Sequence, residues 1–244
     1  MVDTASSVDR EAARSASASG EPSRQATVHY LTPLIAPTRV GLLTRDASAA
    51  ASGSKRLLDI LASSIALLMF LPLLLVIAVA VRLETHGPAL FRQRRTGLNG
   101  KIFTIYKFRT MAVAEDDDIR HATKNDSRVT PLGLVLRKCS LDELPQLLNI
   151  VKGDMSIVGP RPHAVSHDEL YGAQIPAYNL RFRTKPGLTG LAQVSGLRGE
   201  VQALSCMADR VGADNTYIDN WSLGQDLLII LRTIPLMFRD PNAY

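Results

Sequence analysis

The chain has 244 residues, 46% of them hydrophobic, and its 28 lysines and arginines against 23 aspartates and glutamates give a net charge of +5. This length allows one medium-sized domain with additional segments, and two cysteines are too few for a disulfide framework, which favours a reducing compartment. The positive charge suits a membrane surface or a phosphate-rich substrate. Because the sequence contains no DNA- or RNA-binding motif, we expect no nucleic-acid partner.

Residues 1–53 are rich in alanine, serine, threonine and arginine and poor in aromatic residues. Such a composition buries too little apolar surface to offset the conformational entropy lost on folding. The sequence therefore predicts a disordered tail over residues 1–53, which ends in the linker-like stretch "ASAAASGS" (47–54).

The segment "ILASSIALLMFLPLLLVIAVAV", from Ile60 to Val81, carries no charge and as a helix would be about 33 Å long, enough to span a bilayer core. Pro72 near its middle removes one helical hydrogen bond, so we expect a kink or a break there. Basic residues flank the segment on both sides. A bent segment that enters and leaves by the same face fits these features, and so does a single kinked transmembrane helix. We assign residues 54–86 to this membrane element.

The stretch "FRQRRTGLNGKIFTIYKFRTM" (91–111) alternates apolar residues with cations around "LNGK", which predicts two strands joined by a turn. Lys107 and Arg109 would then share one strand face as a cationic strip for phosphate oxygens. A solvated strand face close to anionic lipid explains the same charges. Further along, "DLLIILRTIPLMF" (226–238) predicts an amphipathic or buried helix near the membrane surface.

The stretch "LRKCSLDELPQLLNIVKGDMS" (136–156) predicts a helix, because its leucines recur at helical spacing and Gly153 is a suitable C-terminal stop. Ser140 and Glu143 match a capping box, in which Glu143 has only a structural role.

Pro145 moves the expected start of this helix towards Asp142, because a proline within the first three helical residues costs no hydrogen bond. The positive end of the helix dipole would then favour the ionised form of both Asp142 and Glu143, as a nucleophile or a metal ligand requires. From these residues alone, helix capping and catalysis both explain the two carboxylates.

Two further segments present arginines beside prolines or glycines. "SIVGPRPHA" (156–164) would hold Arg161 rigidly between two prolines, which suits bidentate phosphate binding as well as a structural corner. "RFRTKPGLTGLAQVSGLRG" (181–199) places cations among glycines that allow a backbone to approach a ligand closely. Neither segment contains a P-loop or a GxGxxG pattern, so neither nucleotide-binding fingerprint applies.

Taken together, these segments resemble the bacterial sugar transferases, the monotopic phosphoglycosyl transferases that begin glycan and exopolysaccharide synthesis. The resemblance covers about residues 54–240. It is carried by "KRLLDI" (55–60), "GPALFRQRRTGLNGKIFTIYKFRTM" (87–111), "LDELPQLLNIVKGDMSIVGPRP" (141–162), "KPGLTGLAQVSG" (185–196) and "YIDNWSLGQDLLIILRT" (217–233). It implies an α+β, predominantly helical fold with amphipathic surface helices, a small β-hairpin and a re-entrant hydrophobic helix broken at Pro72. Residues 87–244 would form the cytoplasmic catalytic domain.

The same resemblance implies transfer of hexose 1-phosphate, with glucose the best match, from a UDP-sugar to undecaprenyl phosphate, with release of UMP. The reaction would take place at the cytoplasmic face of the bacterial inner membrane. Asp142 would attack the sugar-linked phosphate and, with Glu143, would hold Mg²⁺. The implied substrate- and phosphate-binding residues are Lys107, Arg109, Arg137, Arg161, Arg183, Lys185, Arg198 and Asp214. Further expected partners are membrane lipid, a second copy of the chain and other polysaccharide-assembly proteins.

Two alternatives remain for the activity. The first is the same reaction with galactose 1-phosphate, and the second is a non-catalytic, membrane-associated partner in polysaccharide assembly. The intact Asp142–Glu143 pair argues against the second. The chain departs from the family at Leu191, where many members have tryptophan, and at Cys139, which replaces a small polar residue.

Overall fold

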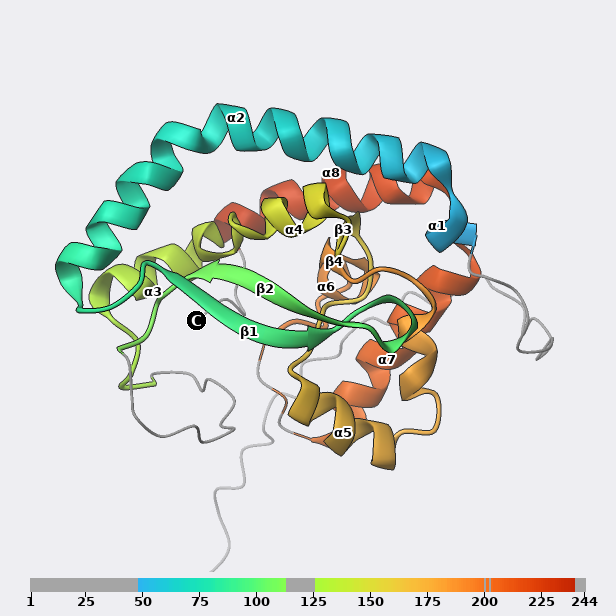
Figure 1. The fold of residues 1–244 in the computed structure, drawn as a ribbon. Helices are drawn as coiled ribbons and strands as arrows, with labels where there is room; N and C mark the ends of the chain where they lie inside the picture. The colour runs from blue at the N-terminus through green and yellow to red at the C-terminus, as the bar shows by residue number, and fades with distance from the viewer. Residues whose placement is uncertain (1–47, 113–125, 200, 202, 240–244) are drawn as a thin grey trace, which may run out of the picture. The chain divides into compact units, whose positions relative to one another are not determined.

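The hydrophobic segment forms one continuous helix, α2 (Gly53–Glu84), which follows the short helix α1 (Ser48–Ala51). The computed structural model describes residues 48–112, 126–199, 201 and 203–239. The predicted disordered tail covered residues 1–53, but helix α1 already begins at Ser48, within that range. Residues 1–47 of the predicted tail lie outside the described residues. Pro72 lies inside α2, and Figure 1 shows the helix bent along its length. The expected break is a bend in an unbroken helix, because one missing N–H removes a single bond from a long ladder.

Strands β1 (Leu90–Thr96) and β2 (Ile102–Phe108) form the predicted hairpin and pair antiparallel along their whole length. The turn between them contains Asn99 in the left-handed conformation (φ 54°), followed by Gly100 (φ 76°). Asparagine and glycine tolerate positive φ better than other residues, so "LNGK" forms the turn that its composition predicts.

The chain after the hairpin contains α3 (Pro131–Lys138), a 3-10 turn (Leu141–Glu143) and α4 (Gln146–Lys152). Gly153 ends α4 with φ 95°, as predicted for a C-terminal glycine.

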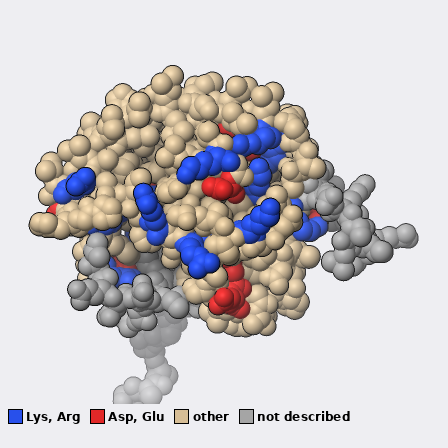
Figure 2. All heavy atoms as spheres, viewed as in Figure 1, with Lys and Arg blue, Asp and Glu red and all other residues tan. Residues whose placement is uncertain are grey.

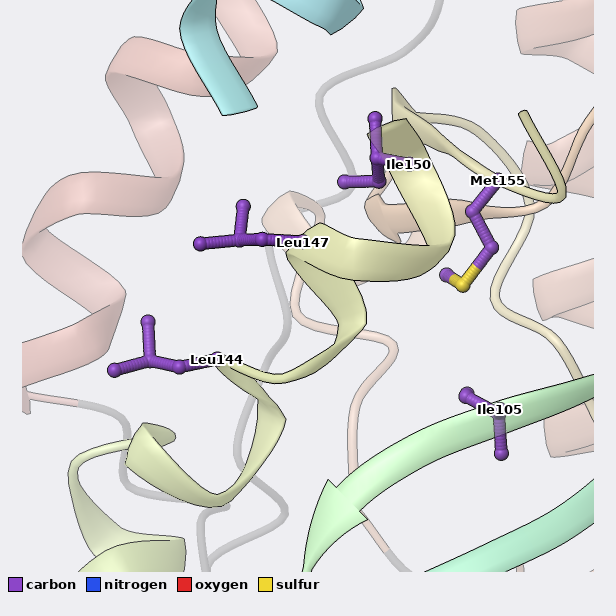
Figure 3. Packing of buried hydrophobic residues seen from close by; sticks show 5 residues of the cluster. All are labelled: Ile105, Leu144, Leu147, Ile150 and Met155. Atoms are coloured by element: carbon purple, nitrogen blue, oxygen red, sulfur yellow. The ribbon is translucent and has the colours of Figure 1, made fainter. Parts of the chain in front are cut away.

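Apolar side chains around α4 form a hydrophobic cluster, and Figure 3 shows Leu144, Leu147, Ile150, Met155 and Ile105 of β2 in it. Partly buried side chains of α2 pack against the same cluster: Ala66, Leu67, Phe70 and Leu74. Burial of these groups removes apolar surface from water, which is the main stabilising contribution to such a core. The cluster therefore fixes α4, and the turn before it, between α2 and the hairpin.

The remaining elements follow in chain order: β3 (Ser156–Val158), α5 (Val165–Gln174), a 3-10 segment η3 (Tyr178–Arg183), β4 (Gly187–Thr189), α6 (Leu191–Val194), α7 (Leu204–Asp219) and α8 (Leu223–Arg239). Strand β4 pairs parallel with β3. The predicted α+β, mostly helical class is confirmed. The second sheet was not predicted, because three-residue strands are too short to show a period in the sequence.

Both ends of α2 are attached to this body by basic side chains. Near its start, the Lys55 ammonium donates to the Asp226 carboxylate of α8 at 2.6 Å. At its other end, the Arg109 guanidinium donates to the main-chain carbonyl of Thr85 at 2.8 Å and to that of His86. By length and composition, α2 could cross a membrane, yet it also packs against α4, β3, α3 and β2. Helix α2 therefore runs along the body of the protein.

Candidate active site

The backbone around Asp142 differs from the predicted helix start. Ser140 has φ 54°, and its side chain makes no capping bond. Asp142 and Glu143 lie in the 3-10 turn, and the regular helix begins at Gln146, directly after Pro145. The main-chain N–H of Glu143 donates to the Ser140 carbonyl at 3.2 Å. The capping box and the N-cap role of Asp142 are therefore wrong predictions, because the tight turn supplies backbone partners in place of side-chain caps.

The Glu143 carboxylate is buried and paired with two cations. Its Oε1 accepts from Lys107 Nζ at 2.8 Å and from Arg161 Nη2 at 2.5 Å, and its Oε2 accepts from Arg161 Nη1 at 3.2 Å. Burial alone would raise the pKa of Glu143, but the charges of Arg161 and Lys107 outweigh burial and hold this pKa well below its usual range. Glu143 is therefore a paired anion at neutral pH.

The neighbouring Asp142 carboxylate is unpaired, and its pKa shifts in the opposite direction to that of Glu143. Asp142 is 8% exposed, and its side chain has no hydrogen-bond or ion-pair partner among the described residues. Burial raises its pKa to about 6, and the charge of Glu143 adds to the increase. The expectation that both carboxyls are driven towards ionisation is wrong for Asp142, because burial and a like charge dominate there. At pH 7 Asp142 is still mainly ionised, as an unpaired anion.

Two more of the predicted phosphate ligands lie close to this pair. Arg137 Nε donates to Thr110 Oγ1 at 2.9 Å, and the positive charge of Arg137 lowers the pKa of Asp142. Arg198 Nη2 donates to Ser140 Oγ at 3.1 Å, two residues before Asp142. Lys107 and Arg161 bind Glu143, the charge of Arg137 acts on Asp142, and Arg198 contacts the residue at the start of the turn. Four cations therefore lie around the turn that carries both carboxylates.

Arg109 and Lys185 are not brought to this site. Arg109 holds the C-terminal end of α2, because β2 ends one residue earlier and the alternation that would align Arg109 with Lys107 stops there. Lys185 lies beside Gly153, at the end of α4 that is farthest from Asp142. The expected cationic strip of Lys107 and Arg109 is therefore wrong.

Arg183 and Asp214 have partners of their own. Arg183 Nη2 lies 2.8 Å from Asp219 Oδ1, in an ion pair that is partly open to solvent. Asp214, only 3% exposed, accepts a hydrogen bond from Arg181 Nε at 2.8 Å. Because its carboxylate is buried and paired with Arg181, Asp214 is a structural partner of an arginine in this structure and is not exposed to substrate.

Sequence reasoning missed two arginines behind the site, of which Arg181 is buried and Arg95 is partly buried. Arg181 Nη2 donates to the main-chain carbonyl of Arg161 at 2.6 Å, and Arg95 Nη1 donates to that of Pro162 at 3.1 Å. No local signal distinguishes Arg95 from the other arginines of "FRQRR". Arg181 stands one residue from Phe182 in a run of alternating cations, which indicates a strand and not the 3-10 segment that forms.

The Asp142–Glu143 pair can also be tested as a binding site for a metal ion. The described part of the chain contains no group of three or more His, Cys, Asp or Glu side chains placed to share a metal. Asp142 has unpaired oxygens, and Glu143 Oε2 accepts one bond, at 3.2 Å. Mg²⁺ is commonly held by one or two carboxylates when waters and substrate phosphates complete its coordination. These two residues therefore fit a magnesium ion that binds together with a phosphate substrate.

Comparison with known proteins points to a single family. The model of the family described as bacterial sugar transferase matches residues 50–240. The UDP-glucose:undecaprenyl-phosphate glucose-1-phosphate transferase of Caulobacter vibrioides is 53% identical over 78% of this chain and 72% of its own length. The protein of the same name from Escherichia coli is 48% identical over 79% of this chain. The exopolysaccharide production protein ExoY of Rhizobium meliloti is 44% identical over 78% of this chain and 88% of its own length.

These relatives differ in how much of their own length the chain spans. The match takes in 43% of the Escherichia coli protein and 41% of the relative from Klebsiella pneumoniae, less than half of each. The family model nevertheless covers most of this chain, and it includes Asp142, Glu143 and the four cations around them. The chain therefore belongs to the bacterial sugar transferase family.

Proposed function

We propose that this protein transfers glucose 1-phosphate from UDP-glucose to undecaprenyl phosphate and releases UMP. The observation that carries the proposal is the unpaired Asp142 carboxylate, which lies beside Glu143 within a group of four cations. An unpaired anion in such a site is available for attack on phosphorus, whereas Glu143 is engaged by Lys107 and Arg161. The names of relatives about 50% identical to this chain support the choice of substrates.

The proposed reaction has two balanced steps. An Asp142 carboxylate oxygen attacks the sugar-bearing phosphorus of UDP-glucose, and the bond from that phosphorus to the bridging oxygen breaks, so that UMP leaves with this oxygen. A phosphate oxygen of undecaprenyl phosphate then attacks the same phosphorus, and the bond to Asp142 breaks. The diphosphate-linked lipid product leaves, and the carboxylate is regenerated. Donor and acceptor can therefore use one site in turn.

The surrounding cations support this chemistry. Attack by a carboxylate on a diphosphate brings negative charges together, and fixed positive groups reduce this repulsion in the transition state. Lys107, Arg137, Arg161 and Arg198 would supply those charges. The raised pKa of Asp142, about 6, makes it more basic than an ordinary aspartate, while leaving it mainly ionised at pH 7.

We further propose that Asp142 and Glu143 hold Mg²⁺ when substrate is bound. The ion would supply charge neutralisation at the phosphate oxygens. Because Lys107 and Arg161 already neutralise Glu143, the pair binds a cation weakly without substrate and more strongly when phosphates add their own oxygen ligands.

The membrane arrangement that we propose is a re-entrant α2 at the cytoplasmic face of the inner membrane. Lys55 and Arg109 attach the two ends of α2 to one body, and a helix that crossed the bilayer would separate these attachments by the thickness of the membrane. Large apolar side chains along α2 are exposed: Leu61, Ile65, Leu68, Met69, Val76 and Val79. Figure 2 shows a broad uncharged surface along the middle of α2, above a face on which lysines and arginines gather. Lipid would cover the apolar surface.

Cysteine labelling tests the topology. In a Cys139→Ser, Cys206→Ser background, we expect Ala51→Cys, at an exposed position before α2, to react with a membrane-impermeant maleimide only after spheroplasts are lysed. Asp209→Cys, exposed on α7, serves as the control for the cytoplasmic side. Labelling of Ala51→Cys in intact spheroplasts, with Asp209→Cys still protected, would indicate a helix that spans the membrane.

The activity itself is tested by UMP release from a panel of UDP-sugars in the presence of undecaprenyl phosphate. We expect the highest kcat/KM with UDP-glucose, loss of the reaction after treatment with EDTA, and recovery when Mg²⁺ is restored. A higher value with UDP-galactose would replace glucose by galactose as the transferred sugar. Absence of UMP from every donor would favour the non-catalytic role in polysaccharide assembly.

A further inference from the structure

The loop between β3 and α5 brings Arg161 to Glu143, and two arginines, Arg181 (buried) and Arg95 (partly buried), bind consecutive main-chain carbonyls of this loop. Arg181 Nη2 donates to the Arg161 carbonyl at 2.6 Å, and Arg95 Nη1 donates to the Pro162 carbonyl at 3.1 Å. Among the described residues, Arg181 makes no hydrogen bond or ion pair with Asp142 or Glu143, so its effect on the pair passes through the loop. The charge of Arg95 also acts on Glu143 directly.

Arg181 is itself held rigidly. It is 3% exposed, its Nε donates to the Asp214 carboxylate at 2.8 Å, and its guanidinium lies over the Tyr178 ring at 5.1 Å from the centroid. Asp214, on α7, is equally buried. A planar guanidinium fixed by a carboxylate on one edge presents its remaining N–H groups in a defined direction. Asp214 of α7 therefore fixes the direction in which Arg181 donates to the Arg161 carbonyl.

The Arg161 side chain depends on this support. The side chain is 36% exposed, yet its Nη2 lies 2.5 Å from Glu143 Oε1. Long, half-exposed side chains lose considerable rotamer freedom when they are held in one geometry. Pro160, Pro162 and the hydrogen bonds from Arg181 and Arg95 fix the backbone of the loop. A fixed backbone leaves the Arg161 side chain with less conformational freedom to lose when it binds Glu143. The position of the Arg161 main chain thus controls how well its side chain engages Glu143.

We propose that Arg181, anchored by Asp214, is a positioning residue that holds Arg161 on Glu143, and that Arg95 supports the same loop. The catalytic consequence rests on the proposed function, but the positioning itself does not. Asp214 and Arg181 thereby have a role in this site without touching substrate.

A double-mutant cycle tests this proposal. We expect Arg181→Met to lower kcat/KM about 10- to 100-fold, because small displacements of a positioned group cost rates of this order. In an Arg161→Lys background, Arg181→Met should lower kcat/KM less than about 3-fold, because the effects of substitutions at two residues that act through one another are not additive. Equal losses in both backgrounds would overturn the proposal. Arg128→Met, which removes a different arginine–carboxylate pair with Asp126, controls for loss of such a pair elsewhere.

A second measurement does not need turnover. With ¹³C-labelled glutamate in detergent micelles, and Glu143→Gln to assign the signal, we expect the Glu143 carboxyl of the wild-type protein to titrate well below the usual range. Arg181→Met should raise this pKa, because Arg161 is no longer held against the carboxylate. Should the wild-type protein release no UMP, the proposed function fails, and this titration still decides the positioning.

Stability must be separated from positioning. If Arg181→Met does not fold, Asp214→Asn removes the anchor charge while keeping the size of the side chain, and the same cycle and titration apply. An unchanged Glu143 titration accompanied by a lower melting temperature would show that Arg181 supports only the fold, and would overturn the proposal.

Discussion

The Asp142→Asn variant is expected to lose UMP release and, at the same time, to melt at a higher temperature than the wild-type protein. The loss of activity follows because an amide lacks the anionic oxygen that attacks phosphorus, and removal of such a nucleophile commonly costs a factor of about 10³ or more. Arg161, Lys107 and Glu143 are left in place by this nearly isosteric change.

The gain in stability follows from the pKa of Asp142. Burial, followed by the charge of Glu143, raises this pKa to about 6, well above the usual range for an aspartate. A carboxyl whose pKa is higher in the folded than in the unfolded protein destabilises the fold when it is ionised. This destabilisation is complete above about pH 6 and disappears as the pH falls towards 4. At pH 7 it amounts to roughly 1–3 kcal/mol, which the neutral asparagine avoids.

Two measurements check this prediction. A donor radiolabelled in the sugar phosphate should attach covalently to the wild-type protein in the absence of acceptor and should not attach to Asp142→Asn. Melting temperatures without Mg²⁺ should differ most at pH 7.5 and converge near pH 4. Asp209→Asn, an exposed carboxylate on α7, serves as the matched control and should change neither quantity. Normal turnover by Asp142→Asn would exclude it as the nucleophile.

Most residues of the site could be predicted from the sequence, but the pKa shifts of its two carboxylates could not. Asp142, Glu143 and Arg161 lie in short stretches whose composition already points to anionic and phosphate chemistry. The hairpin was predictable because period-two alternation and "LNGK" are local signals. The ionisation states of the two carboxylates were not predictable, because Glu143 owes its lowered pKa in part to Lys107, 36 residues earlier on β2.

The same limit applies to the arginines. Lys107 and Arg109 are equivalent by alternation, but the end of β2 between them sends one to Glu143 and the other to the carbonyls at the end of α2. Arg181 donates both to the Arg161 carbonyl and to Asp214, which lies 33 residues further along the chain on α7. Contacts of this kind depend on tertiary packing, about which residue spacing carries no information.

Glu143→Gln is expected to have the opposite effect on stability from Asp142→Asn, although the two residues are adjacent. The charges of Arg161 and Lys107 hold the pKa of Glu143 well below its usual range, against the effect of burial. A carboxyl with a lowered pKa stabilises the fold when ionised. That contribution is present above the unfolded-state pKa, about 4.3, and is lost as the pH falls through the lower pKa of the folded state.

Glutamine removes this contribution and leaves two cations without their anion. Lys107 is 19% exposed in its side chain, and loss of one partner from a buried pair is destabilising because the remaining charge cannot fully rehydrate. Since Arg161 is more exposed and can turn to solvent, we expect a loss of about 2–3 kcal/mol at pH 7, below the range for fully buried pairs.

The melting temperatures of Glu143→Gln, Asp142→Asn and the double variant, measured at pH 7, test this prediction. If both single variants shift the melting temperature in the same direction, the division into a paired Glu143 and an unpaired Asp142 is wrong. If they shift it in opposite directions, the destabilising charge lies on Asp142, the residue proposed to attack phosphorus.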